Sequence, residues 1–160
     1  MKLTIEKHIF ELLKYHDCVI ITGLGGFILN YRGAYINQIT HKIYPPSKII
    51  SFNANLSGND GLLANYLTEV ENIDYNEACL EILKFSRKAK LKLEKGETII
   101  FKNIGTLNLN DAKKIEFSTK NEFNFNTDSY GLTSFQIAKL ETNTKKNNPS
   151  FMSAAAAIIL

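Results

Sequence analysis

The sequence predicts an α+β fold made of two small units in tandem, each a short antiparallel sheet with helices packed on one side. Three observations support this prediction. The 160 residues are 44% hydrophobic and 22% charged, a normal soluble composition that excludes wholesale disorder and a polytopic membrane protein. The length is enough for one ordinary domain or two very small ones. Helical and strand-like patterns follow one another along the chain, and one helix–hairpin pattern occurs twice.

The first unit is expected over residues 1–58 and begins with a helix in 3–15, where apolar side chains recur at helical spacing. Two β-rich runs, 19–21 and 27–31, flank a glycine turn and predict a hairpin. The turn contains Gly23, Gly25 and Gly26. A β-rich run, and not a helix, follows these glycines, so a structural turn is favoured over a phosphate-binding loop.

A β-arm is expected next, over residues 33–44, where apolar and polar residues alternate loosely. Pro45 and Pro46 then mark a break in the pattern. Residues 49–52 are expected to form a short strand that ends at Phe52. The first unit therefore consists of a helix, a hairpin, an arm and a closing strand.

The second unit is expected over residues 59–137 and begins with two helices. Asp60 and Gly61 precede the first of them, with Asp60 as the expected N-cap. Asp74 is expected to cap the second, longer helix, which Gly96 ends in the C′ position. Three strands are then expected at 97–102, 106–110 and 114–118.

The internal repeat appears when the chain is shifted by 80 residues. Residues 19–30 then align with residues 99–110 without gaps, and Gly25 coincides with Gly105. The helices that precede the two hairpins align as well. A second match is expected at a shift of 83, which brings Phe52 onto Phe135. The two units should therefore share a fold.

The net charge of +3 does not by itself demand a nucleic-acid partner. The one dense positive stretch lies in the long helix of the second unit, where lysines recur on one face. A phosphate-binding stripe has this pattern, and so does the solvated face of an amphipathic helix, which we favour. The candidate residues for binding nucleic acid or another partner are Arg32, Lys42, Lys48, Lys84, Arg87, Lys88, Lys92, Lys95 and Lys102.

No group of residues in the sequence predicts catalysis, a metal site or a cofactor. His8, His16 and His41 lack the spacing of metal ligands. Cys18 and Cys79 are too few for a disulfide framework and suit buried, reduced thiols. No nucleophile stands beside a base in a recognisable pattern. We therefore expect a protein that is not an enzyme.

Several motifs together resemble the bacterial histone-like family that includes HU and IHF. The end of the long helix leads through a strand into Ile104-Gly105-Thr106-Leu107, which resembles that family's glycine turn. The segment Pro46-Ser47-Lys48-Ile49-Ile50-Ser51-Phe52-Asn53 resembles the return of the family's arm into the sheet. With Gly23-Leu24-Gly25-Gly26-Phe27 and Asn59-Asp60-Gly61-Leu62-Leu63, the combination is similar to the tandem HU-like domains at the N-terminus of bacterial SPOR-domain proteins. The structural motif residues are Gly23, Gly25, Gly26, Pro45, Pro46, Phe52, Asp60, Gly61 and Gly105.

This resemblance covers about residues 1–137 and implies that the two units pair as an intramolecular pseudo-dimer, because HU is a dimer. In the SPOR-domain proteins a membrane helix and a distant peptidoglycan-binding domain follow. Residues 138–150 are accordingly expected to be a polar linker, and residues 151–160, from Phe151 on, the start of a membrane helix flanked by Lys145 and Lys146. The apolar run is about half of the roughly 20 residues that a span needs, so a short greasy terminal segment is the alternative. Peptidoglycan would be bound only by a domain outside these 160 residues.

The function expected first is a cytoplasmic interaction module of a single-pass inner-membrane protein, with its N-terminus inside the cell, which tethers a protein or DNA partner to the envelope. The alternative is a soluble HU-type nucleoid protein that binds DNA. Typical HU arms are long and basic and carry a proline at the tip that kinks the duplex. Here the arm offers Arg32 and Lys42 beside His41, and its prolines stand at the return. These departures argue against DNA bending.

Overall fold

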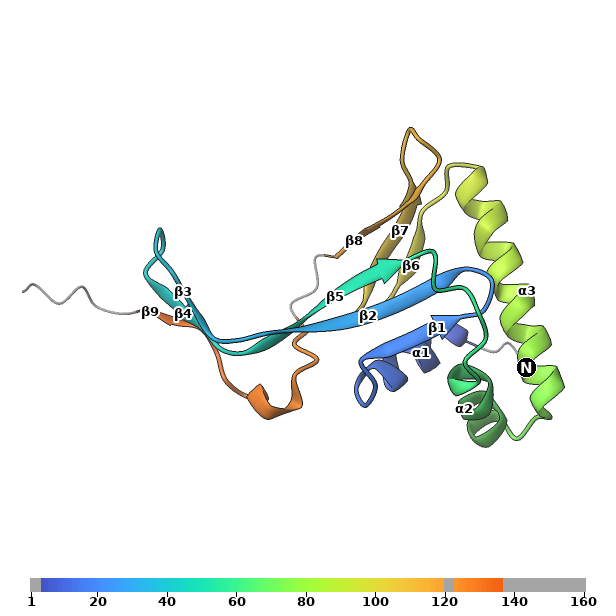
Figure 1. The fold of residues 1–160 in the computed structure, drawn as a ribbon, viewed down its shortest axis with the longest axis horizontal. Coiled ribbons are helices and arrows are strands. Elements are labelled where there is room, and N and C mark those ends of the chain that lie inside the picture. Colours follow the sequence, from blue (N-terminus) through green and yellow to red (C-terminus); the bar gives the residue numbers. More distant parts are fainter. Residues whose placement is uncertain (1–3, 120–122, 137–160) are drawn as a thin grey trace, which may run out of the picture.

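The computed structural model of this chain describes residues 4–119 and 123–136. In these ranges the chain forms three α-helices and three small antiparallel sheets (Figure 1). The predicted α+β architecture is therefore confirmed.

The first sheet belongs to the first unit and has the strand order β1-β2-β5. Its elements are α1 (Ile5–Leu13), β1 (Cys18–Ile21), β2 (Gly25–Arg32) and β5 (Ser47–Asn53). The helix and the predicted hairpin stand where the sequence places them. One face of α1, with Ile5, Ile9, Leu12 and Leu13, is buried against the sheet, as an amphipathic helix requires.

The arm is a continuation of β2 and β5, which run outward from the body (Figure 1). Beyond them, β3 (Tyr35–Asn37) and β4 (Lys42–Tyr44) form a hairpin, and β9 (Phe135–Gln136) pairs with β4. The predicted arm is thus confirmed, with Pro45 and Pro46 connecting β4 to β5. The third strand, β9, comes from the end of the described chain.

The second unit contains α2 (Leu62–Glu71), α3 (Tyr75–Glu94) and a sheet of β6 (Ile99–Phe101), β7 (Gly105–Leu109) and β8 (Ile115–Ser118) in that order. A short 3-10 helix, η1 (Thr127–Ser129), follows. Asp74 caps α3 as predicted, because its Oδ2 accepts a hydrogen bond of 2.9 Å from the Asn76 amide. Gly96 follows the helix with φ +78°, the left-handed conformation usual at this position.

The predicted N-cap of α2 is wrong by one residue. Gly61, with φ +80°, takes the cap position, and Asp60 precedes it. Glycine reaches this left-handed conformation without the strain that a side chain would add. The Asp60 carboxylate still serves the helix end, because its Oδ1 accepts a hydrogen bond of 3.1 Å from the Leu62 amide.

The two hairpins predicted by the repeat have the same construction. Gly25 and Gly105 have φ values of +151° and +155°, and each faces an aromatic ring from the third strand of its sheet. That ring belongs to Phe52 in the first unit and to Phe117 in the second. The expected match between Phe52 and Phe135 is therefore wrong, because Phe135 lies in β9 on the arm.

The two units share one hydrophobic core, as the expected pseudo-dimer requires. The ring of Phe27 in β2 lies 5.0 Å from that of Phe101 in β6 and 5.7 Å from that of Phe117 in β8, centre to centre. A hydrogen bond of 2.5 Å from the Ser86 hydroxyl of α3 to the Thr22 carbonyl also joins the units.

The second helix also links the units, because α2 contacts α1 and β1 of the first unit as well as α3. His8 Nε2 of α1 lies 2.8 Å from Glu71 Oε1 of α2, and the His8 ring makes an edge contact with Tyr66. The proposed division into residues 1–58 and 59–137 stays a prediction.

The expected linker at 138–150 and the apolar run at 151–160 lie outside the described residues. Among the residues that the structure describes, no helix is both long and apolar enough to cross a bilayer.

Candidate partner-binding surfaces

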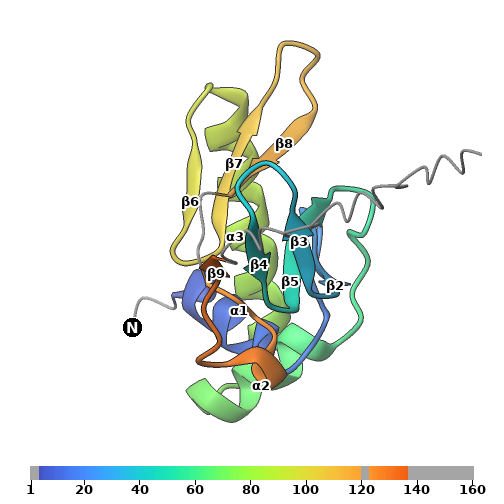
Figure 2. The same ribbon diagram turned by 90° about the vertical axis from the view of Figure 1, so that its left-hand side faces the viewer.

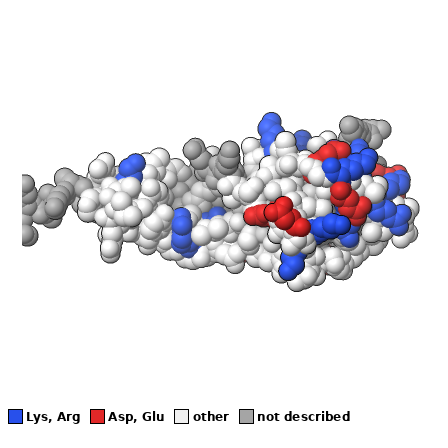
Figure 3. All heavy atoms as spheres, turned by 90° about the horizontal axis from the view of Figure 1, so that it is seen from above, with Lys and Arg blue, Asp and Glu red and all other residues white. Residues whose placement is uncertain are grey.

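Charged side chains gather at the α3 end of the molecule and are sparse on the arm in the view of Figure 3. Lysines and acidic residues are interspersed over the body, whereas the arm is almost wholly uncharged there. Five of the nine predicted cationic residues line two concave surfaces, one at the base of the arm and one beside α3.

The arm-base hollow is a cavity of about 660 Å³ lined by Arg32, Tyr44, Ser47, Lys48, Phe123 and Asn124 among others. It brings together Arg32 and Lys48, two of the predicted site residues. The Arg32 guanidinium lies 4.3 Å from the centre of the Tyr35 ring, a cation–π contact that orients it. The Ser47 hydroxyl is buried and makes no hydrogen bond to the described residues.

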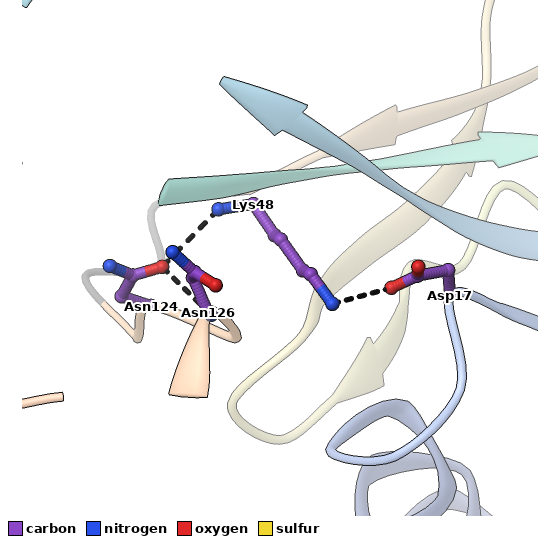
Figure 4. A network of polar contacts seen from close by, with 4 residues as sticks. All are labelled: Asp17, Lys48, Asn124 and Asn126. Atoms are coloured by element: carbon purple, nitrogen blue, oxygen red, sulfur yellow. Dashed lines mark hydrogen bonds and ion pairs between the residues drawn. The ribbon is translucent and has the colours of Figure 1, made fainter. Parts of the chain in front are cut away.

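Lys48 has a structural role at this hollow (Figure 4). Its Nζ donates a 2.7 Å hydrogen bond to Asp17 Oδ1, and its backbone amide donates one of 3.2 Å to Asn124 Oδ1. Asn124 Nδ2 in turn donates to the Pro46 carbonyl at 3.0 Å, and the Asn126 amide donates to Asn124 Oδ1. Through these hydrogen bonds Asn124, in the segment after β8, is bound to Pro46 and Lys48 at the start of β5. Lys48 is therefore partly neutralised, and Arg32 is the freer cation of the hollow.

The β6 groove is a second cavity, of about 500 Å³, between α3, β6 and the start of α1. Lys88 and Lys92 of α3 line it together with Lys102, which follows β6. Its apolar lining comes from Phe85, Ala89, Ile99 and Ile100. The structure thus brings three of the predicted lysines together around an apolar floor.

The other predicted cations of α3 do not line this groove. Lys84 makes a 2.7 Å ion pair with Glu81, and this hydrogen bond raises the pKa of the Lys84 ammonium. Arg87 and Lys95 are exposed, and Lys95 is the C-cap residue of α3. The predicted basic residues of α3 therefore fall into two groups. Lys88 and Lys92 line the groove, whereas Lys84, Arg87 and Lys95 lie outside it.

The arm has an apolar surface that the sequence analysis missed. Ile36 of β3 is 56% exposed, Ile39 at the tip 91% and Phe135 of β9 60%. Lys42, in β4, is the arm's outer predicted cation. From the sequence alone, an apolar residue in a strand is expected to be buried. These side chains are exposed because the arm projects away from the body of the protein.

The described residues offer binding surfaces and no recognisable reactive centre. They contain no cluster of three or more side chains able to hold a metal ion. Burial, with a smaller contribution from Asp60, raises the pKa of the Cys18 thiol, which keeps it protonated and weakly nucleophilic at neutral pH.

Comparison with known families assigns both units. A family model described as CCDC81-like prokaryotic HU domain 1 matches residues 2–60, and one described as CCDC81-like prokaryotic HU domain 2 matches residues 61–130. Searches of curated proteins and of solved structures gave no match. HU-like domains are typically binding modules without catalytic activity. With its repeated hairpins, its shared core and these two matches, the chain belongs to the CCDC81-like prokaryotic HU family and carries two such domains in tandem.

Proposed function

We propose that this chain is a non-catalytic interaction module whose β-arm binds a protein partner, and that it tethers this partner to the cell envelope. The observation that carries the proposal is the surface of the arm. Ile36, Ile39 and Phe135 are all more than half exposed there. Clustered apolar side chains on a projecting element are typical of protein-binding sites.

The charge of the arm supports a protein partner over DNA. DNA binding draws most of its affinity from lysine and arginine side chains that neutralise phosphates. The arm and its base offer Arg32, Lys42 and Lys48, and Lys48 is already paired with Asp17. Binding to a protein surface with apolar pockets requires no such cations. Such a partner would bury the side chain of Ile39.

Photo-crosslinking in cells tests the arm. A benzoylphenylalanine replaces Ile39 at the arm tip, and a matched control carries it at Leu91 of α3, which is 58% exposed. We expect one discrete protein adduct from position 39 and none of the same size from position 91. Adducts to DNA at position 39, or the same adducts from both positions, would reject a protein-binding arm.

The tethering part of the proposal rests on the C-terminal sequence. Lys145 and Lys146 precede the apolar run that starts at Phe151, and basic residues flank membrane helices on the cytoplasmic side. A reporter fused after residue 140 of the full-length protein should then be active only in the cytoplasm. Periplasmic activity at that position would reject the tether and leave the arm proposal standing.

DNA is the second candidate partner, and the arm-base hollow is the observation that favours it. Arg32 and Lys48 line one cavity there, beside the buried Ser47 hydroxyl. Such a site could receive a phosphate, in which case the chain would act as an HU-type DNA-binding protein. Titration of a dye-labelled DNA duplex at low and at physiological salt separates this candidate from the first.

A further inference from the structure

The β6 groove has a charge that its surroundings do not balance. Lys88, Lys92 and Lys102 line it, against one carboxylate, that of Glu6. None of these three lysines makes an ion pair with the residues that the structure describes, in contrast to Lys84 on the same helix. The described lining of the groove therefore presents a net positive charge to a ligand.

The groove also borders β6, which is an edge strand of its sheet among the described residues. In its sheet, β6 is hydrogen-bonded to β7 alone, and no described element lies beyond its outer side in Figure 2. Ile100, the middle residue of β6, is 70% exposed. An edge strand has unpaired backbone N–H and C=O groups, which an extended peptide can bind as an additional strand.

The shape and the apolar lining of the β6 groove favour a peptide over a nucleic-acid duplex as its ligand. Phe85, Ala89 and Ile99 form an apolar floor inside a concavity of about 500 Å³. A phosphate backbone has no apolar group to place there, whereas a peptide strand directs alternate side chains to opposite sides. On one side of such a strand, apolar side chains would cover the floor, and on the other side its carboxylates would neutralise the three lysines.

We propose that the β6 groove binds an extended acidic segment of a partner protein, which adds as a strand to the free edge of β6. Its carboxylates pair with Lys88, Lys92 and Lys102. This contact is separate from the one proposed for the arm, since α3 and the arm tip lie at opposite ends of the molecule (Figure 1). The chain would then hold partners at two surfaces.

A fluorescently labelled peptide of alternating glutamate and valine is the probe, titrated against the 160-residue chain by anisotropy. The test variant is Lys88→Glu with Lys92→Glu. The matched control is Arg87→Glu with Lys90→Glu, which makes the same change of charge on the same helix at exposed residues outside the groove. Circular dichroism of both variants checks that the fold is kept.

We expect the groove variant to weaken binding by about tenfold or more, because two attractions become repulsions, and the control by less than about threefold. A lysine–valine peptide should not bind, and a glutamate–valine peptide with N-methylated backbone amides should lose most of its affinity. Equal losses in the two variants would overturn the groove as the site. Undiminished binding of the N-methylated peptide would overturn strand addition. If a DNA duplex displaced the labelled peptide at a lower midpoint concentration than the unlabelled peptide does, the groove would be assigned to nucleic acid.

Discussion

Gly25 and Gly105 each begin the second strand of a hairpin at a point where an aromatic ring and a backbone carbonyl leave no room for a side chain. A Cβ built on Gly25 would lie 2.9 Å from the Asn53 carbonyl oxygen, and one built on Gly105 would lie 2.6 Å from that of Ser118. Both residues also have positive φ values, which L-residues other than glycine rarely adopt. The same backbone conformation is therefore required in both units.

Replacing Gly105 by alanine should destabilise the protein by roughly 2–5 kcal/mol, because backbone strain and overpacking against Phe117 add together. Gly33→Ala is the matched control, since a Cβ there meets nothing within 4 Å. Urea denaturation measures both. Similar stabilities for the two variants would show that Gly105 is not under this constraint.

At the residue scale the sequence indicated the glycines but not their partners. Gly25 and Gly105 share a local sequence pattern that identifies them as counterparts, whereas only a short motif supports the match of Phe52 to Phe135. The true counterpart, Phe117, is set by the register of β8 on β7, which no local spacing reveals. The pairing of Lys48 with Asp17 and Asn124 likewise depends on contacts between residues far apart in the chain.

At the scale of elements, α3 packs into the core that the two units share and lines the β6 groove. Its buried face, with Ala78, Ile82, Ser86, Ala89 and Leu93, packs into the shared core, and its exposed lysines border the β6 groove. The N-terminus of this helix depends on Asp74, whose carboxylate accepts the Asn76 amide. The Asp74 cap fixes where α3 begins, and α3 in turn positions the lysines that line the groove.

Asp74→Ala should cost about 1 kcal/mol of stability, because an amide at the start of α3 loses its acceptor. Asp74→Ser keeps a capping oxygen and should restore most of this loss. Thermal unfolding of the two variants provides the comparison. An alanine variant as stable as the parent would mean that the cap contributes nothing.

Helices and hairpins were predictable as elements because their signals are local: apolar spacing, glycine turns and caps. The third strand of the arm was not. β9 contributes two residues that pair with β4 about 90 positions earlier, and its sequence has no strand-like alternation of its own. The apolar surface of the arm was missed for a related reason, since exposure depends on where the arm projects.

At the scale of the whole molecule, the two domains form one folded body. Phe27 contacts aromatic rings from both sheets, and Ser86 bonds the second unit to the first hairpin. The sequence repeat, with the resemblance to a dimeric family, indicated this pairing. The identity of the contacts that join the units, and the bridging position of α2, come from the structure alone.

The shared core predicts that both units unfold together in a single cooperative transition. Tyrosine fluorescence, far-ultraviolet circular dichroism and hydrogen exchange of α1 and of β7 should report the same midpoint in urea. A lower midpoint for one unit, with the other still folded, would contradict a common core.

We expect this HU-like chain to bind protein through its arm and not to bend DNA. The direct measurement is titration of a duplex carrying a donor and an acceptor dye at its ends, at low and at physiological salt. We expect no measurable binding at physiological salt and no change in energy transfer between the two dyes. At low salt we expect only weak binding, with a log–log salt slope of about −3.6 for four phosphate contacts. Tight binding at physiological salt that raises the energy transfer, and therefore bends the duplex, would contradict these expectations.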